Sequence, residues 1–253
     1  MGEVLGRAVS GIEAVSREQW PERLKNGLDA LNIRYDPATP ERLARYHQLL
    51  TEWNQVMNLT GDTDFETSLG RHYLDSLAPL GIEGLFPESA SLIDVGTGAG
   101  FPGLPLKIAQ PDISLTLLDS LDKRVRFLGD VCAATGLADV TCLHARAEEA
   151  PELRGRFDAA VSRAVARLYL LCELCLPLVK VGGAFLSMKS VESGGELEQA
   201  KKAIGILGGR VERTADYSIP GTDVTHRVIF IKKIAETPKK YPRPFAKIKK
   251  NPL

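Results

Sequence analysis

Long apolar segments are absent from this 253-residue sequence. No stretch approaches the ~20 apolar residues that a membrane-spanning helix needs. Charged residues interrupt every apolar run of the opening segment MGEVLGRAVSGIEAVSREQW, so it lacks the apolar core of a signal peptide. Net charge is also absent, because Lys+Arg and Asp+Glu both number 32, and total charge therefore indicates no partner. We expect a protein of the cytoplasm without a membrane segment.

Cysteine is scarce, and its placement excludes a disulfide scaffold. The four cysteines (Cys132, Cys142, Cys172 and Cys175) lie inside apolar periodic segments and not at loop spacings. Cys172-x-x-Cys175 has the spacing of a zinc or redox pair, but it lies within a leucine-rich helical run and no second pair follows at metal spacing. We predict reduced thiols, buried packing for this pair and no metal site.

The charges that are present are unevenly distributed. Between Lys232 and Leu253 there are eight basic residues and one acid, Glu236, a net charge of +7 that leaves −7 for the rest. Such a basic tail is either a solvated, solubilising end or an arm that contacts nucleic-acid phosphates. The sequence leaves both interpretations open.

The first third of the chain predicts helices. Thr39 is a capping residue and Pro40 suits the first helical position. A second helical run is predicted over residues 65–77, and looser helices before residue 39. We therefore expect a helical extension over residues 1–85. An apolar stripe at steps of three or four supports the helix after Pro40: Leu43, Tyr46, Leu50, Trp53 and Met57.

After residue 85 the pattern changes to strand–helix alternation. Five strand-like runs (SLIDV, SLTLLD, VTCLH, FDAAVS and GAFLSMK) are each followed by a helical or short acidic run. This order predicts an α/β fold with a parallel, doubly wound sheet. GRVERTADYSI and VTHRVIFIKK are separated only by PGTD, which is too short to join parallel strands, so they form an antiparallel pair. That ending is typical of class I methyltransferases. We assign this domain to residues 86–234 and the basic tail to residues 235–253.

The segment LIDVGTGAGFPG, residues 92–103, has two interpretations. From Gly98 it matches the G-x-G-x-x-G dinucleotide fingerprint, and from Asp94 it suits an S-adenosylmethionine site. Asp119, about twenty residues later, suits ribose binding in both cases. Asp94 would repel a pyrophosphate and attract the positive methionine portion of S-adenosylmethionine. Pro102 and the glycine after it displace the start of the next helix, which loosens the loop for a bulkier ligand without a phosphate. No group of residues suited to hydride transfer follows. Both observations favour the methyl donor over a dinucleotide.

Seven stretches resemble those of one family, the bacterial 16S ribosomal RNA guanine-N7 methyltransferases (RsmG, or glucose-inhibited division protein B). They run from about residue 54 to the end in the family's order: NLTG, RHYLDSL, DVGTGAGFPGLPL, LLDSLDKRVRFL, HARAEE, SRAVA and KKYPR. The resemblance implies a class I, Rossmann-like fold and an enzyme that methylates guanine N7 in a 16S rRNA loop near the decoding region. Its partner would be 16S rRNA, the small ribosomal subunit or an assembly intermediate, and we expect a monomer.

The resemblance also assigns cofactor positions. The interpretation of Asp119 as a surface turn acid, and of Glu148 as a helix-start acid, stays open. The expected S-adenosylmethionine-binding residues, with Asp94 added from its charge, are Asp94, Gly96, Gly98, Gly100, Phe101, Asp119, Ser120, Leu121, Ala147, Glu148 and Arg163.

The expected chemistry needs no general base, because guanine N7 carries a free lone pair and no proton. It needs N7 placed in line with the methyl group and water excluded. Arg163 would orient the cofactor or bind guanine O6, or it is a salt-bridged structural arginine. Near the junction of the two regions, the resemblance points to RNA or active-site contact at Asn58, Arg71, His72 and Asp75. Asn58 and His72 are candidate catalytic residues, although a histidine at such a junction is more often packed and hydrogen-bonded than catalytic. Candidate RNA-binding residues are Arg71, Lys123, Arg124, Arg146, Lys189, Arg227 and Arg243.

Two departures from the family pattern concern other parts of the chain. Ser190 follows Lys189 where the family has glycine, and Ala246 and Ile248 replace a glycine and a proline of the tail. The cofactor motifs are unaffected. Two other functions remain as alternatives: a nicotinamide-dependent oxidoreductase and a non-catalytic ribosome-assembly factor with the same fold.

Overall fold

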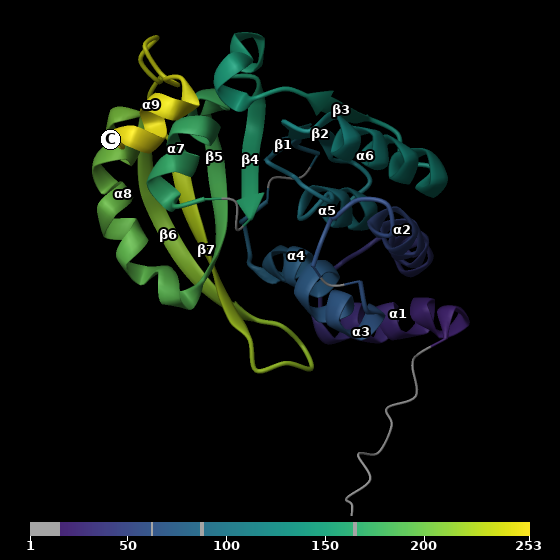
Figure 1. Ribbon diagram of the computed structural model, residues 1–253. Coiled ribbons are helices and arrows are strands. Elements are labelled where there is room, and N and C mark those ends of the chain that lie inside the picture. The colour runs from purple at the N-terminus through teal and green to yellow at the C-terminus, as the bar shows by residue number, and fades with distance from the viewer. Residues whose placement is uncertain (1–15, 62, 87–88, 164–165) are drawn as a thin grey trace, which may run out of the picture.

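A seven-stranded sheet forms the centre of the molecule, with helices on both faces (Figure 1). The computed structural model describes residues 16–61, 63–86, 89–163 and 166–253. The strand order is β3-β2-β1-β4-β5-β7-β6. The strands are β1 (Ser91–Val95), β2 (Ser114–Asp119), β3 (Val140–His144), β4 (Phe157–Arg163), β5 (Val179–Ser190), β6 (Gly209–Ser218) and β7 (Thr225–Lys233).

Strand direction confirms the predicted topology. β1 to β5 are parallel, whereas β7 lies antiparallel between β5 and β6. The carboxyl ends of the parallel strands therefore meet at one edge of the sheet. In open α/β sheets, ligands bind at this edge, where the strand order reverses. Here the reversal lies between β1 and β4, and the glycine loop follows β1.

Two hydrophobic clusters cover the two faces of the sheet, because successive strand residues point to opposite sides. In β1, Leu92 belongs to the first cluster and Ile93 to the second. Helices α1, α2, α5 and α6 pack into the first cluster, and α7, α8 and α9 into the second. The helices are α1 (Trp20–Ala30), α2 (Thr39–Asn54), α3 (Phe65–Ser68), α4 (Asp75–Leu77), α5 (Gly103–Ala109), α6 (Asp122–Thr135), α7 (Leu168–Cys175), α8 (Gly194–Ile206) and α9 (Phe245–Lys250).

The N-terminal helices share one core with the sheet. Leu43, Tyr46 and Leu50 of α2 are fully buried in the first cluster, as their spacing predicts. This cluster continues across residue 85, the domain boundary expected from the sequence. Thr39 does not cap α2: it is the first helical residue, and its hydroxyl donates to the carbonyl of Ile108 at 3.2 Å. The looser helices expected before residue 39 fall partly on residues 1–15, outside the described part of the chain.

The second helical run expected over residues 65–77 is present but changes its winding. Between α3 and α4 lies the π-helical segment η2 (Leu69–Leu74). There the amide of Asp75 donates to the carbonyl of Gly70, five residues earlier. Such wide turns occur frequently at functional sites. This one contains Arg71 and His72, two residues singled out in the sequence.

The basic C-terminal segment packs against the protein and does not extend into solvent as a free arm. Tyr241 and Ile248 are buried, and both belong to the second hydrophobic cluster. Ala246 and Ile248, at the glycine and proline positions of the resembled family, lie within α9. The departure from the family pattern therefore coincides with a short helix. No helix within the described ranges is long and apolar enough to cross a membrane.

Candidate functional site

The loop between β1 and α5 depends on glycine backbone geometry. Gly96, Gly98 and Gly100 have φ values of 72°, 61° and 105°, in the region that favours glycine. A Cβ atom at Gly100 would lie 2.7 Å from the hydroxyl oxygen of Tyr46. That hydroxyl donates to the carbonyl of Ala99. Helix α2 therefore holds the glycine loop directly.

Asp94 lies beneath this loop and does not line an open cavity. Its side chain is 0% exposed, and its Oδ2 accepts hydrogen bonds from the Thr97 hydroxyl at 2.7 Å and the Gly103 amide at 2.8 Å. Burial raises the pKa of Asp94 to about 6, against the opposing effect of these bonds. Asp94 Oδ1 has no hydrogen-bond partner among the described residues. The carboxylate supports the loop, which differs from the direct cofactor contact expected from its charge.

A cavity opens at the carboxyl ends of β1, β2 and β3. Gly96, Asp119, Ser120, Ala147 and Glu148 all line it, although they come from three separate loops. The structure thus brings together a large part of the predicted cofactor set. Sequence reasoning missed the apolar lining residues from α7 and the C-terminal segment: Leu171, Leu174 and Phe245.

Two carboxylates in this cavity have different surroundings. Asp119 is buried, and its two oxygens accept from the amides of Gly98 and Leu121, both at 2.9 Å. It therefore fixes the glycine loop to the start of α6, and the Leu121 side chain itself stays exposed. Glu148, in the 3-10 turn η4 (Ala147–Glu149), has a buried Oε1 without a hydrogen-bond partner among the described residues. The guanidinium of Arg146 is 3.9 Å from that oxygen.

Phe101 points away from this cavity, toward the N-terminal helices. Its ring stacks on His72 with centroids 4.8 Å apart and on Tyr46 at 5.3 Å. The guanidinium carbon of Arg163 lies 5.2 Å from the same ring. Phe101 is buried by these contacts and joins the loop to the helices, and it is not among the residues that line the cavity.

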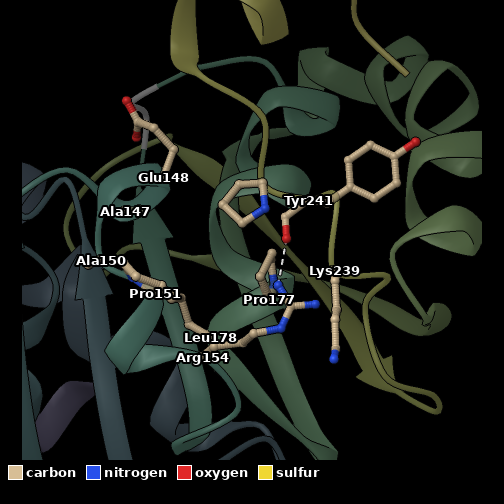
Figure 2. Close-up of a pocket in the computed structure, with 10 residues that line it drawn as sticks. Ala147, Glu148, Ala150, Pro151, Arg154, Pro177, Leu178, Lys239 and Tyr241 are labelled. Atoms are coloured by element: carbon tan, nitrogen blue, oxygen red, sulfur yellow. Dashed lines mark hydrogen bonds between the residues drawn. The ribbon is translucent and has the colours of Figure 1, made fainter.

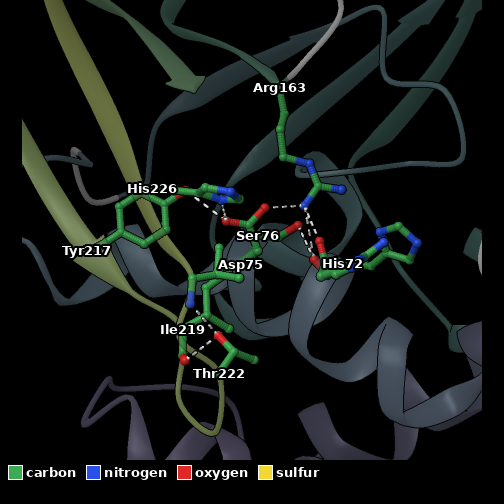
Figure 3. A network of polar contacts seen from close by, with 10 residues as sticks. His72, Asp75, Ser76, Arg163, Tyr217, Ile219, Thr222 and His226 are labelled. Carbon is green, nitrogen blue, oxygen red and sulfur yellow. Dashed lines mark hydrogen bonds and ion pairs between the residues drawn. The ribbon is translucent and has the colours of Figure 1, made fainter. Parts of the chain in front are cut away.

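Arg163, at the end of β4, belongs to a buried polar cluster (Figure 3). Its Nη1 donates to Asp75 Oδ2 at 2.7 Å and to the carbonyl of Arg71 at 3.0 Å. The other oxygen of Asp75 accepts from the Tyr217 hydroxyl at 2.9 Å and lies 2.7 Å from Nδ1 of His226. We call Asp75, Arg163, Tyr217 and His226 the Asp75 cluster.

The charge of Asp75 is maintained although only 2% of the residue is exposed. Burial alone would raise its pKa, but the hydrogen bond from His226 and the positive charge of Arg163 outweigh burial and hold the pKa below its ordinary value. The cluster joins α4, β4 and both strands of the C-terminal hairpin. Tyr217 and His226 carry no local sequence signal, because they lie 142 and 151 residues from Asp75.

The other residues expected near this junction occupy different places. His72 lies with its Nε2 3.1 Å from the Thr60 hydroxyl, and its ring stacks on Phe101, as expected for a packed histidine. Asn58 is exposed in the turn after α2. The turn is held by Asn54, whose Oδ1 accepts from the amide of Leu59 at 2.7 Å.

The candidate RNA-binding residues divide into two groups. Arg71 and Lys123 are exposed, and Arg124 and Arg146 line the cavity. Both cavity residues lie beside carboxylates, Arg124 at 3.4 Å from Asp119 and Arg146 at 3.9 Å from Glu148. The other three form shorter ion pairs: Lys189 with Glu196 at 3.0 Å, Arg227 with Asp216 at 2.6 Å and Arg243 with Glu173 at 2.6 Å. The side chains of Lys189 and Arg243 are also largely buried, which differs from the solvent-facing positions expected of them.

Cys172 and Cys175 lie buried on α7 as free thiols. Burial raises the pKa of both thiols, which disfavours the thiolate form that binds metals. Their surroundings agree with the predicted packing role. Residues 164–165, in the motif SRAVA, lie outside the described residues.

Comparison with known proteins gives closely related sequences. The profile of a family described as rRNA small subunit methyltransferase G matches residues 39–222. A ribosomal RNA small subunit methyltransferase G of Alkaliphilus oremlandii is 48% identical over 91% of this chain and 97% of its own length. The protein of that name from Acetivibrio thermocellus is 45% identical over 91% and 95%.

Among solved structures, similarity extends to the fold alone. A chain in the complex of a Haloferax volcanii methyltransferase activator with a methyltransferase superposes with a TM-score of 0.52. It is 16% identical and covers 67% of this chain and 93% of that chain. The two proteins therefore share the sheet and its flanking helices. Their sequence identity is too low to indicate a common substrate.

Proposed function

The chain belongs to the rRNA small subunit methyltransferase G family, and on that premise we propose that it methylates guanine N7 in 16S rRNA, in a loop near the decoding region. Membership of this family supports the interpretation of the glycine loop as an S-adenosylmethionine site. The observation that carries the proposal is the convergence of Gly96, Asp119 and Glu148 on one cavity at the carboxyl ends of the strands. The substrate would be the RNA itself, the small subunit or an assembly intermediate.

The residues present fit the cofactor. A Cβ atom at Gly100 would lie 2.5 Å from Leu104, so the loop backbone keeps its tight path only without side chains. Asp119 Oδ1 accepts from one backbone amide, which leaves a lone pair for a ribose hydroxyl. Its Oδ2 accepts from the Gly98 amide and lies 3.4 Å from Nη1 of Arg124. The buried Oε1 of Glu148 has no hydrogen-bond partner among the described residues and is an acceptor for an adenine amine. When bound, S-adenosylmethionine supplies an electrophilic methyl group on a sulfonium.

The protein's task is positioning and the exclusion of water. Guanine N7 presents a lone pair without a proton, so no residue has to remove one. The Asp75 carboxylate does not need to act as a base, and its oxygens are already hydrogen-bonded to Arg163, Tyr217 and His226. Holding N7 and the methyl group in line converts a bimolecular reaction into an effectively unimolecular one.

We assign Arg163 to the guanine side of the site. Among the described residues, its hydrogen bonds all use Nη1, which is turned toward Asp75 and the carbonyls of Arg71 and His72. The second terminal nitrogen is then available to donate to guanine O6, an acceptor that arginine commonly binds. Donation to O6 would leave N7 free to attack. The base would have to be accessible or turned out of its stack.

Two measurements on the full chain test the proposal. Calorimetric titration with S-adenosylhomocysteine and with NAD identifies the cofactor. Mass spectrometry of nucleosides then detects N7-methylguanosine after incubation of S-adenosylmethionine with unmodified 16S rRNA or with small subunits. We expect S-adenosylhomocysteine binding and the modified nucleoside. NAD binding alone would support an oxidoreductase, and cofactor binding without methylation of either substrate would support an assembly factor.

A matched pair of variants tests the assigned carboxylate. Asp119→Ala removes acceptors from two backbone amides and from the ribose, and we expect about 10- to 100-fold weaker S-adenosylhomocysteine binding. Asp122→Ala changes a half-exposed acid on the next turn and serves as the control. Equal affinities in the two variants would contradict the assignment of Asp119.

A further inference from the structure

One wall of the cofactor cavity comes from the C-terminal segment, which follows the last strand of the sheet. Phe245, the first residue of α9, lines the cavity together with Leu171 and Leu174 of α7. We call residues 237–250, which end in α9, the C-terminal strap. The basic composition of the strap had suggested contact with RNA, but one of its two aromatic residues, Phe245, lies at the cofactor cavity.

An ion pair fixes the strap to the helix that lines the cavity. Arg243 donates from Nε and from its backbone amide to Glu173 Oε1, at 2.7 and 2.9 Å, and from Nη2 to Oε2 at 2.6 Å. Glu173 lies on α7 between Leu171 and Leu174, and its side chain is 1% exposed. This three-bond contact places Phe245, two residues later, beside the apolar residues of α7.

Further contacts hold the strap on both sides of Arg243. Before it, Arg154 donates to the carbonyl of Tyr241 at 2.5 Å and to the carbonyl of Thr237. Figure 2 shows this guanidinium pointing to the Tyr241 carbonyl beside Pro177, in a second cavity that Ala147 and Glu148 also line. After it, Ile248 is buried in the second hydrophobic cluster. The position of Phe245 is therefore set by contacts that do not involve Phe245 itself.

The Phe245 ring is partly exposed although the residues on both sides of it are held in place. The residue is 37% exposed, whereas the leucines beside it on α7 are buried. The cavity thus has an apolar, aromatic wall on the α7–α9 side, and the acids Asp119 and Glu148 on the strand side. The two basic lining residues, Arg124 and Arg146, lie 3.4 and 3.9 Å from these acids, which offset their charge. A planar aromatic group with polar edges matches both the apolar and the acidic side.

We propose that Phe245 packs against the adenine ring of the cofactor and that the C-terminal strap closes the adenine end of the cavity. This inference rests on the proposed placement of the adenosine portion between Asp119 and Glu148. Stacking on an aromatic side chain contributes substantially to the binding of a base, and the sheltered ring excludes water from the adenine. Phe245 is a binding residue for the cofactor and takes no part in methyl transfer.

Calorimetry on the full chain tests this assignment with S-adenosylhomocysteine and with adenosine as probes. Phe245→Ala should weaken the binding of both ligands about tenfold, and Phe245→Tyr should restore it to within about threefold. Lys249→Ala changes an exposed residue of the same helix and should bind as the wild type does. Thermal unfolding of each variant reports whether the fold is kept.

A second readout does not depend on the loss of affinity. In Phe245→Trp, S-adenosylhomocysteine should change the tryptophan emission more than in the wild type, whose two tryptophans, Trp20 and Trp53, pack in the first hydrophobic cluster. Unchanged affinity in Phe245→Ala, or unchanged emission in a Phe245→Trp protein that binds the ligand, would overturn the assignment. In either case a wild type that binds and methylates leaves the proposed function intact. A wild type that binds neither probe would overturn both.

Discussion

The glycine loop and the Asp75 cluster hold their buried carboxylates in different ways. Asp94 and Asp119 accept mainly from backbone amides and a nearby hydroxyl of the glycine loop and the turn after β2. Asp75 instead accepts from side chains on β4, β6 and β7. Backbone donors give a rigid local cradle, whereas side-chain donors join distant elements. The cavity therefore depends on the path of one loop, and the cluster on the assembly of the whole fold.

The largest loss of stability is expected from a substitution of Asp75. Asp75→Ala leaves the largely buried Arg163 guanidinium without its counter-charge, and removing one partner of a buried ion pair costs about 3–5 kcal/mol. We expect the free energy of unfolding in urea to fall by this amount. Asp216→Ala removes one partner of the more exposed Arg227 ion pair and should change stability by less than about 1 kcal/mol. Similar losses in both variants would contradict a special role for the buried cluster.

Gly100→Ala is expected to act next most strongly, and on the cavity. The residue has φ of 105°, and the new Cβ would lie 2.5 Å from Leu104 and 2.7 Å from Tyr46. Strain and displacement of the loop should together cost about 2–4 kcal/mol of stability and weaken S-adenosylhomocysteine binding. In Gly129→Ala, within α6, the Cβ meets nothing within 4 Å, and this variant should be neutral or stabilised. Wild-type behaviour of Gly100→Ala would show that the loop shifts at little cost.

These regions also differ in how far the sequence predicts them. The parallel strands and the glycine loop follow from periodicity and turn chemistry. Strand ends in a parallel sheet must meet, so the place of Asp119 was predictable, whereas Glu148 was singled out by the family resemblance. Tyr217 and His226 were not, because only the antiparallel packing of β7 against β5 brings that hairpin to Asp75. The motif predicts the Phe101 loop but not its side-chain direction, which the packing of α2 and η2 determines.

The contributions of Asp94 and Asp75 to stability should depend on pH with opposite signs. Asp94 has its pKa raised to about 6 from 3.8, so the native state binds more protons than the unfolded state between these values. Its contribution to stability therefore increases as the pH falls through 6, whereas that of Asp75, whose pKa is lowered, is lost as the pH falls below about 4.

Protonated Asp94 accepts less well from Thr97 and Gly103, which opposes binding of the cofactor at low pH. If the loop needs the ionised form, S-adenosylhomocysteine affinity should be about twofold lower at pH 6 than at pH 8, and about tenfold lower at pH 5. Asp94→Asn should bind more weakly and without this pH dependence. Calorimetry across this range checks both, with Asp122→Asn as the control. A flat wild-type profile would contradict titration of Asp94 in this range.

The smallest expected effect concerns which basic residues reach RNA beside the cavity. Lys123 is exposed on α6, one residue before Arg124 of the cavity wall, whereas Lys201 lies on α8, whose apolar side packs in the second cluster. Removal of one phosphate contact lowers the slope of log K against log salt by about 0.7 for single-stranded RNA. Lys123→Ala should show this change and bind 16S rRNA roughly two- to threefold more weakly at moderate salt. Lys201→Ala should show neither, and equal slopes for the two variants in filter-binding titrations would place the RNA on another face.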